Sequence, residues 1–559
     1  MPFMPKLSVS RHISRRVPVA GAAAVLAAAG LAAVPQASVA KTSQTVIIQD
    51  GQDLSNPNGT LAQFRALGAT TVRVIVPWSS IAPKPNSTKK PSFNATDPNA
   101  YPKSNWGPYD GIVRAAQKYN LQVDFTVTGG APVWAEGKNI PKAGTQDKFF
   151  AWEPNDQDYG QFMQAVGTRY DGSFTPSGTT TPLPAVRFWV IFNEPNFGED
   201  LGPQAIDDSR VLIAPMLYRG LIDAGWSALQ KNHRGQTILW GDFAARGFYL
   251  SYGPRGRGAP QGYPGNYGQT RPGYFLRYLY CVGGNYRRLT GSAAKSVGCP
   301  TSGSAAAFRK AHPALFSATG VGVHPYPLNG TPVNDGRVKD YATFPELGSF
   351  AGNLDRSVRA WGSGKKFGIY DDEYGYITNP PNRQLVSNPP TSGRHPYLSA
   401  STAAYYINWA EYLSWRNPRI QSYMQYLLRD PGANAGAYAG FASGLENANG
   451  THKATYDAFR LPVYMPKTSI RRGSKATVWG AARPAPFQSG AQTVSIQLNG
   501  RTIARVTPGK QGGYFDVGVK FTSSGTVRLV YSYPKTDPLL PVGDLGQTVY
   551  SRSFKITVH

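Results

Sequence analysis

The chain has 559 residues, of which 58 are Lys or Arg and 32 are Asp or Glu, so its formal net charge at pH 7 is +26. Aromatic residues make up 12% of the chain and charged residues only 16%, which excludes an intrinsically disordered protein. The 61 Gly and 46 Pro exclude a coiled coil or a helical bundle, because they would interrupt long helices. The positive charge leaves nucleic acid, an anionic surface and solubility as explanations.

Residues 1–40 have the three parts of a secretory signal peptide. A basic start without acids is followed by an Ala-, Val- and Leu-rich run (17–34) and by the small residues Ala-Ser-Val-Ala. We predict cleavage after Ala40, and the pair Arg15-Arg16 hints at twin-arginine export. A membrane anchor is the alternative, which the weak hydrophobicity of an Ala-rich run disfavours. We find no membrane span in the predicted mature chain, which we expect to be secreted or associated with the cell envelope.

From about residue 45 to 430, short apolar runs alternate with amphipathic stretches of helical period. The predicted strands are residues 46–48, 71–76, 122–127, 186–192, 237–240, 321–323, 367–370 and 420–427. The predicted helices include residues 61–67, 109–119, 159–170, 212–229 and 403–415. Eight strands with helices between them predict an α/β fold, a (β/α)8 TIM barrel that occupies residues 41–460.

Two cysteines lie within this region. Cys281 and Cys299 are separated by a polar stretch rich in Gly, Ser, Arg and Asn. In an exported protein such a pair predicts a structural disulfide that closes the loop. A metal site would need further ligands nearby, and a catalytic thiol would be unpaired.

After Leu461-Pro462 the helical pattern ends. Alternating segments at 493–498, 502–506 and 526–531 are separated by turn signals such as Asn499-Gly500. Short strands without helices over residues 461–559 predict a small all-β sandwich, which we expect to be immunoglobulin-like. The boundary between the two predicted domains falls at 462–466.

Acidic residues follow two of the predicted barrel strands. Glu194 follows the fourth strand within Phe-Asn-Glu-Pro-Asn, and the seventh strand runs into Asp371-Asp372-Glu373. The carboxyl ends of barrel strands meet at one face, so these two acidic ends face each other across it. Two opposed carboxylates are what glycoside hydrolysis requires, one as proton donor and one as nucleophile or base. A helix N-cap acid after each strand is the structural alternative.

These motifs resemble those of the clan A retaining glycoside hydrolases, the 4/7 superfamily. The resemblance covers about residues 45–430 and implies that Glu194 is the acid/base and that Glu373, rather than either preceding aspartate, is the nucleophile. It further implies that Asn193 binds the sugar 2-hydroxyl. The remaining implied site residues are Arg73 on strand two, which supports the nucleophile, and His324 and Tyr326 of a His-x-Tyr element on strand six, whose Tyr bonds to the nucleophile in many members.

Individual families are matched less closely. Gly129-Gly-Ala-Pro-Val-Trp134 is similar to the strand-three exit of family 39, and a family 5-like chain is the other assignment. The end of strand eight carries Gln425-Tyr-Leu-Leu-Arg429 in place of the Trp found in the clan. Strand three lacks the His that marks many endoglucanases. The sequence therefore does not indicate a cellulase.

Several further residues are candidates with a structural alternative. Trp78, Trp106, Trp134 and Trp152 lie on or after early strand ends, where they would stack on sugar rings or pack in the core. Asp242 would bond to substrate or cap a helix. No cluster in the sequence has the spacing of metal ligands and no phosphate-binding loop follows a strand, so we expect no metal and no cofactor.

We therefore expect a secreted retaining glycosidase that hydrolyses O-glycosidic bonds of polysaccharides or oligosaccharides through a glycosyl-enzyme intermediate. The alternative is a carbohydrate- or cell-wall-binding protein on a barrel without catalysis. No motif supports nucleic-acid binding. Residues 461–559 hold 13 basic and 3 acidic residues, so the charge is concentrated there. This points to an anionic cell envelope or an acidic glycan as partner, with a basic solvated surface as the alternative.

Overall fold

The structure is a computed structural model. It describes residues 44–51, 53–141, 150–205, 211–249, 269–327, 329–334, 338–378, 397–432, 441–485, 492–509 and 512–559. The predicted signal peptide with its Arg15-Arg16 pair lies outside these residues. In the described part of the chain, no helix is both long enough and apolar enough to cross a membrane.

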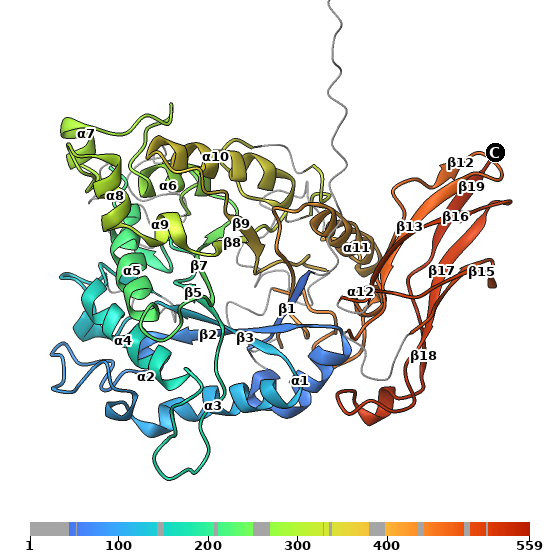
Figure 1. Cartoon of the computed structure of the whole chain (residues 1–559), viewed down its shortest axis with the longest axis horizontal. Coiled ribbons are helices and arrows are strands. Elements are labelled where there is room, and N and C mark those ends of the chain that lie inside the picture. Colours follow the sequence, from blue (N-terminus) through green and yellow to red (C-terminus); the bar gives the residue numbers. More distant parts are fainter. Residues whose placement is uncertain are drawn as a thin grey trace, which may run out of the picture. The chain divides into compact units, whose positions relative to one another are not determined.

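The first sheet has eight strands in the order β10-β1-β2-β3-β5-β7-β8-β9, and all its neighbouring strands are parallel (Figure 1). Its strands are β1 (Thr45–Gln49), β2 (Thr71–Pro77), β3 (Gln122–Thr128), β5 (Phe188–Ile191), β7 (Thr237–Ala244), β8 (Gly320–His324), β9 (Gly368–Asp371) and β10 (Ser422–Tyr426). Each of them overlaps one of the eight predicted strands. The prediction of a parallel eight-stranded barrel is therefore confirmed.

The barrel closes between β9 and β10, where the pairing is short. A single bridge joins Ile369 to Ile420, in which the Ile369 N–H donates to Arg419 O (2.7 Å) and the Gln421 N–H donates to Ile369 O (2.7 Å). The Ser422 hydroxyl adds a hydrogen bond to Asp371 O (2.7 Å). Closure therefore brings the end of β9, and the residues that follow it, next to the first residue of β10.

Helices lie between the strands, and each helix that the sequence analysis gave by its residue range overlaps one of them. They are α1 (Pro57–Ala66), α2 (Trp78–Ile81), α3 (Lys103–Lys118), α4 (Asp156–Arg169), α5 (Ala214–Leu229), α6 (Pro272–Leu279), α7 (Gly291–Lys295), α8 (Ala305–Ala311), α9 (Ala314–Ser317), α10 (Leu347–Ala360), α11 (Ala400–Arg416) and α12 (Ala454–Arg460). Helices α1 and α3 begin earlier than predicted. Pro57 takes the first position of α1, where proline is favoured, whereas Pro108 lies inside α3. The two-stranded sheet of β4 (Ala151–Trp152) and β6 (Leu201–Gly202) and helix α10 were not predicted.

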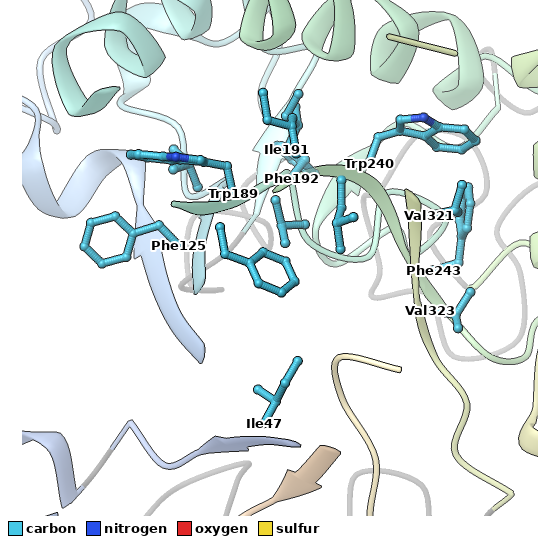
Figure 2. Packing of buried hydrophobic residues seen from close by; sticks show 14 of the residues in the cluster. Ile47, Phe125, Trp189, Ile191, Phe192, Trp240, Phe243, Val321 and Val323 are labelled. Atoms are coloured by element: carbon cyan, nitrogen blue, oxygen red, sulfur yellow. The ribbon is translucent and has the colours of Figure 1, made fainter. Parts of the chain in front are cut away.

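The barrel strands place apolar side chains outward, against the helices, and several polar ones inward. Phe125, Trp189 and Trp240 belong to the main hydrophobic cluster, and Phe125 packs edge to face on Trp189 with ring centroids 5.8 Å apart (Figure 2). On β3 the alternate residues Asp124 and Thr126 are fully buried polar side chains. Because successive residues of a strand point to opposite faces, these polar residues lie inside the barrel.

The two cysteines form the predicted disulfide. Cys281 and Cys299 are bonded to each other and are both nearly fully buried. The sulfur of Cys281 also accepts a hydrogen bond from the Arg219 side chain of α5 (3.2 Å). The disulfide therefore ties the segment after α6 to the helical layer.

Two antiparallel or mixed sheets follow the barrel. One has the order β11-β13-β16, and the other has the order β12-β19-β17-β14-β15 with β18 paired to β17. The strands are β11 (Val463–Tyr464), β12 (Ser469–Ile470), β13 (Lys475–Ala481), β14 (Val494–Leu498), β15 (Arg501–Val506), β16 (Tyr514–Lys520), β17 (Gly525–Ser532), β18 (Thr548–Tyr550) and β19 (Phe554–Val558). Residues 499 and 500 both have positive φ, as a two-residue hairpin turn requires. The all-β prediction is confirmed, whereas the immunoglobulin-like sandwich stays a prediction.

The all-β region packs on helix α11. Tyr412 and Trp415 of α11 form one buried aromatic cluster with Tyr464, Trp479 and Tyr514 of the following strands. The Glu411 carboxylate, which is also buried, accepts a hydrogen bond from the Tyr514 hydroxyl (2.8 Å). These contacts connect the two regions, and the domain division at 460/461 stays a prediction.

Gly320 tests how tightly the barrel interior is packed. A Cβ on Gly320 would lie 2.5 Å from the Tyr370 ring and 2.8 Å from the Gly368 carbonyl oxygen. We expect Gly320→Ala to lower the free energy of unfolding by about 1–3 kcal/mol through overpacking. Gly364→Ala, where a Cβ meets nothing within 4 Å, is the matched control and should change it by less than about 0.5 kcal/mol. Denaturant unfolding of both variants measures the difference, and equal stabilities would contradict this packing.

Candidate active site

Arg73 lies inside the barrel at the centre of the candidate site, with a fully buried side chain. All five of its N–H groups donate hydrogen bonds. The acceptors are Glu373 Oε2 (2.7 Å) and Gln49 Oε1 (2.6 Å) for Nη1, Asp242 Oδ2 (2.8 Å) and Asn193 Oδ1 (2.8 Å) for Nη2, and Thr126 Oγ1 (3.1 Å) for Nε. Burial opposes the charge on Arg73, but the nearby carboxylates outweigh burial and raise its pKa above the ordinary value. Arg73 is therefore a permanent cation that joins strand ends around the barrel.

Glu373 follows β9 and is the member of its acidic triplet that reaches the surface. Its side chain is 16% exposed, whereas Asp371 and Asp372 are fully buried. Besides Arg73, it accepts a hydrogen bond from the Tyr326 hydroxyl at Oε1 (2.9 Å). Both carboxylate oxygens are thus held by a donor, which fixes the orientation of Glu373.

Glu194 follows β5, and its backbone is bent to present the side chain at the strand end. Phe192 and Glu194 have positive φ values of 73° and 37°, and the Glu194 N–H donates to Asp242 O (3.0 Å). Such conformations are costly for residues other than glycine and persist only where neighbouring contacts hold them. The Glu194 side chain is 18% exposed. Burial raises the pKa of its carboxyl, against the opposing effect of His324.

The two glutamates lie close together. One oxygen of Glu194, one oxygen of Glu373 and one ring nitrogen of His324 all lie within 4.8 Å of one another. Glu373 forms an ion pair with Arg73, whereas Glu194 sits in surroundings that favour its protonated form. A pair of carboxyl groups whose surroundings differ in this way suits one to donate a proton and the other to act as a nucleophile or base.

His324 is the last residue of β8 and is fully buried beneath the two glutamates. Its Nδ1 lies 2.7 Å from Glu194 Oε1 and 3.8 Å from Glu373 Oε2. Burial lowers the pKa of its imidazole, but Glu373, Asp242 and Glu194 outweigh burial and raise that pKa to about 10. His324 therefore carries a positive charge at neutral pH.

Asn193 is held on both sides of its side-chain amide. Its Oδ1 accepts from Arg73, its Nδ2 donates to Asp200 Oδ1 (3.1 Å), and its backbone N–H donates to Thr128 Oγ1 (2.9 Å). The amide orientation is thereby fixed beside Glu194. The structure thus brings Arg73, Asn193, Glu194, His324, Tyr326 and Glu373 into one site.

The tryptophans expected near the site lie mostly in the core. Trp78 is 1% exposed, stacks on Phe162 and packs edge to face on Trp134, so its ring lies in the aromatic core. Trp106 (1% exposed) and Trp152 (5%) are buried as well. Trp78 is the first residue of α2 and is buried there, and its predicted contact with substrate stays a prediction. Trp134 is partly exposed and stays a candidate.

Asp242 has a role that the sequence did not indicate. It lies inside β7 with a φ of 44°, is fully buried, and accepts a hydrogen bond from Arg73, so it neither faces substrate nor caps a helix. Burial raises the pKa of Asp242, but His324 and Arg73 outweigh burial and lower it to about 2. Asp242 is therefore an anion buried between two cations.

Two groups in the site have the spacing of metal ligands, although the sequence showed no such cluster. They are Glu194, His324 and Glu373, and Asp242, His324 and Asp372. Arg73 forms ion pairs with a member of each group, at Glu373 and at Asp242. A permanent positive charge in contact with these oxygens disfavours a bound cation.

An aromatic group near the site was also missed. The rings of Tyr326, Tyr426 and Phe441 pack edge to face, with centroids 5.2–6.5 Å apart. Tyr426 ends β10, where the clan is expected to carry Trp. Its position at the end of the eighth strand was the available signal, whereas Phe441 lies in a loop that no sequence pattern places.

No protein-family model and no curated protein matches this sequence. Among solved structures, an exo-β-1,4-mannosidase from an Opitutaceae bacterium is 13% identical, with a TM-score of 0.38, over 74% of this chain and 58% of that one. The β-glycosidase of Thermosphaera aggregans is 11% identical, with a TM-score of 0.41, over 75% and 95%. A family 5 mannosidase from Rhizomucor miehei is 10% identical, with a TM-score of 0.34, over 75% and 91%. This chain thus spans little more than half of the bacterial mannosidase.

Removal of Arg73 tests its structural role. Arg73→Leu leaves Asp242 and Glu373 without their cation, so we expect the free energy of unfolding at pH 7 to fall by about 3–5 kcal/mol. Arg187→Leu changes an exposed arginine and should cost less than about 0.5 kcal/mol.

The cost should also depend on pH. The lowered pKa of Asp242 contributes stability that is present above its ordinary value of 3.8 and is lost as the pH falls toward 2. The difference between wild type and Arg73→Leu should therefore shrink below pH 4 in denaturant titrations. A difference that is constant from pH 7 to pH 3 would contradict the ion pair.

Proposed function

We propose that this chain is a retaining glycosidase, in which Glu373 is the nucleophile and Glu194 the acid/base. The observation that carries the proposal is the spacing of the two glutamates, which have oxygens within 4.8 Å of each other. Retaining glycosidases hold their two carboxyl groups about 5–5.5 Å apart, whereas inverting enzymes need about 6.5–9.5 Å to admit a water molecule. The proposal also agrees with the clan A motifs in the sequence.

In the first step, Glu194 donates its proton to the departing glycosidic oxygen while a Glu373 oxygen attacks the anomeric carbon. The C–O bond to the leaving group breaks and an ester to Glu373 forms. Burial, which raises the pKa of Glu194, supports its role as the proton donor near neutral pH. Arg73 and Tyr326, one on each carboxylate oxygen, orient Glu373 for the attack.

In the second step, the Glu194 carboxylate takes a proton from water, and the water oxygen attacks the anomeric carbon. The ester bond breaks and Glu373 leaves as a carboxylate. The positive charge of His324, which lies 2.7 Å from Glu194 Oε1, stabilises Glu194 while it is ionised. Burial therefore favours the protonated Glu194 of the first step, and His324 favours the carboxylate of the second.

The proposed substrate is a polysaccharide or an oligosaccharide, and we propose that the enzyme meets it outside the cell after export by the predicted signal peptide. Tyr326, Tyr426, Phe441 and the partly exposed Trp134 offer aromatic surface for sugar rings. A panel of aryl xylosides, glucosides, arabinofuranosides and mannosides identifies the sugar that is accepted.

Substitution of the two glutamates tests the chemistry. With the best aryl glycoside of the panel, Glu373→Ala should lose about 10⁴-fold or more in kcat, because no nucleophile remains. Glu194→Ala should lose about 10²–10⁴-fold. Azide should restore turnover to both variants, with inverted product from Glu373→Ala and retained product from Glu194→Ala.

Glu153→Gln is the control, because Glu153 is exposed and should be dispensable. Full activity of Glu373→Ala would contradict the assigned roles. A wild type that binds but never hydrolyses these glycosides would favour the non-catalytic carbohydrate-binding alternative.

We further propose that the all-β region holds the enzyme on an anionic cell envelope or an acidic glycan. The outward face of β14, β15, β17 and β19 carries Arg505, Arg528 and Lys555, on alternate positions from the buried residues. The three acidic residues of 461–559, at positions 516, 537 and 544, lie outside these four strands. A basic sheet face of this kind attracts anionic polymers, with an affinity that salt weakens.

The triple variant Arg505→Gln, Arg528→Gln, Lys555→Gln tests this proposal. It should bind anionic cell-wall polymer at least about fivefold more weakly than wild type at low salt, with a smaller difference at high salt. The control is Lys118→Gln, Arg234→Gln, Lys310→Gln, which removes the same charge from exposed barrel residues. Co-sedimentation measures both, and equal losses would mean that net charge alone is responsible.

A further inference from the structure

Two aspartates lie side by side beneath the proposed catalytic glutamates. Asp242 of β7 and Asp372 after β9 are both fully buried. Their carboxyl groups occupy the space over Gly322, where a Cβ would lie 2.0 Å from Asp242 Oδ1 and 2.4 Å from Asp372 Oδ2. Only glycine leaves room for two carboxyl groups at this position of β8. The aspartate pair therefore depends on Gly322.

The two aspartates lie near Nε2 of His324, the ring nitrogen on the side opposite Glu194. The imidazole Nε2 lies 3.7 Å from Asp242 Oδ2 and 3.9 Å from Asp372 Oδ1, while Nδ1 contacts Glu194. Arg73 contacts the same region, with Nη2 3.4 Å from His324 Nε2. The other charged or titratable groups that act on this cluster include Asp124 of β3, Tyr218 of α5, Asp371 at the end of β9, and Glu373.

Two carboxyl groups in such proximity cannot both be ionised, because like charges in a buried site repel strongly. The contacts decide which one keeps its proton. Asp242 accepts a hydrogen bond from the Arg73 guanidinium at 2.8 Å and so retains the charge. Asp372 has no cation hydrogen-bonded to either oxygen among the described residues, and as a neutral acid it can donate to Asp242.

We propose that Asp242 and Asp372 are positioning residues that share one proton, and that the single charge left on Asp242 keeps His324 an imidazolium against Glu194. This inference rests on the proposed function for its catalytic consequence. The imidazolium donates from Nδ1 to Glu194 Oε1, so the proton that Glu194 transfers is confined to its other oxygen, Oε2. It also stabilises the Glu194 carboxylate in the second step.

The direction of each pKa agrees with this arrangement. Burial raises the pKa of Asp372 well above its ordinary value, and Asp242 adds to the effect. Charged neighbours outweigh burial at the other two groups. They lower the pKa of Asp242 to about 2 and raise the pKa of His324 to about 10. These directions agree with a proton held on Asp372 and with opposite charges on Asp242 and His324.

Nuclear magnetic resonance of ¹⁵N-histidine tests the charge without any substrate. The ring nitrogens of His324, assigned by their loss in His324→Gln, should have imidazolium shifts in wild type at pH 8. They should keep these shifts in Asp372→Asn, where the amide replaces the donating hydroxyl. In Asp242→Asn, His324 should become neutral at least 1 pH unit lower than in wild type, about a tenfold change in its ionisation constant. A neutral His324 in wild type at pH 8 would overturn the proposal.

Kinetics with the best aryl glycoside then test the consequence. Asp372→Asn should lose less in kcat than Asp242→Asn and should keep the wild-type pH profile, because its amide can still donate to Asp242. Asp242→Asn should lose about tenfold or more in kcat, and its profile should shift on the alkaline side. Equal losses in both variants, with thermal unfolding unchanged, would overturn the pair's division of roles.

The two proposals fail in different ways. If no glycoside is hydrolysed while the ¹⁵N shifts behave as expected, the proposed function fails and the charge assignment stands. If hydrolysis depends on both glutamates but His324 is neutral, the function stands and this inference fails. Should Asp242→Asn not fold, the wild-type and Asp372→Asn spectra still decide the charge state.

Discussion

The structure of the site depends on one buried guanidinium. Arg73 is charged, fully enclosed and bonded through all five donors, and its acceptors come from β1, β3, β7 and the ends of β5 and β9. A buried charge is tolerated only where it is paired and fully hydrogen-bonded. The positions of Asn193, Asp242 and Glu373 are therefore coupled to one another, because each supplies part of what keeps Arg73 inside the barrel.

Much of the fold follows from the sequence because its signals are local. The apolar runs of the eight strands and the change of pattern after residue 461 are visible without tertiary contacts. Helix starts were less predictable. Pro57 is the first residue of its helix, whereas Pro108 lies inside α3, where proline usually marks the end of a helix. Helix α10 was missed although Leu347, Phe350, Leu354 and Val358 recur at helical spacing and are buried, so the signal for it was present in the sequence.

The site residues also divide into those with a local sequence signal and those that depend on tertiary contacts. Glu194, Glu373, Arg73, His324 and Tyr326 were predicted because each ends or follows a strand within a short motif. The role of Asp242 was not predictable, because it arises from a pairing with Asp372 across β8 that depends on the absence of a side chain at Gly322. Trp78 follows β2 as the sequence indicated, but the burial of its ring at the start of α2 depends on tertiary packing that the sequence does not show.

The short seam between β9 and β10 has a dynamic consequence. Two backbone hydrogen bonds flank its single bridge, whereas β2 and β3 pair along seven residues. Local opening requires the loss of fewer hydrogen bonds here, so amide hydrogens at this seam should exchange sooner than those of the β2–β3 ladder. Glu373 follows β9 directly, and its carboxylate is tethered to Arg73 on β2. The Arg73–Glu373 ion pair therefore links β2, which pairs extensively with β3, to the end of β9 at the seam. It limits how far β9 can separate from β10.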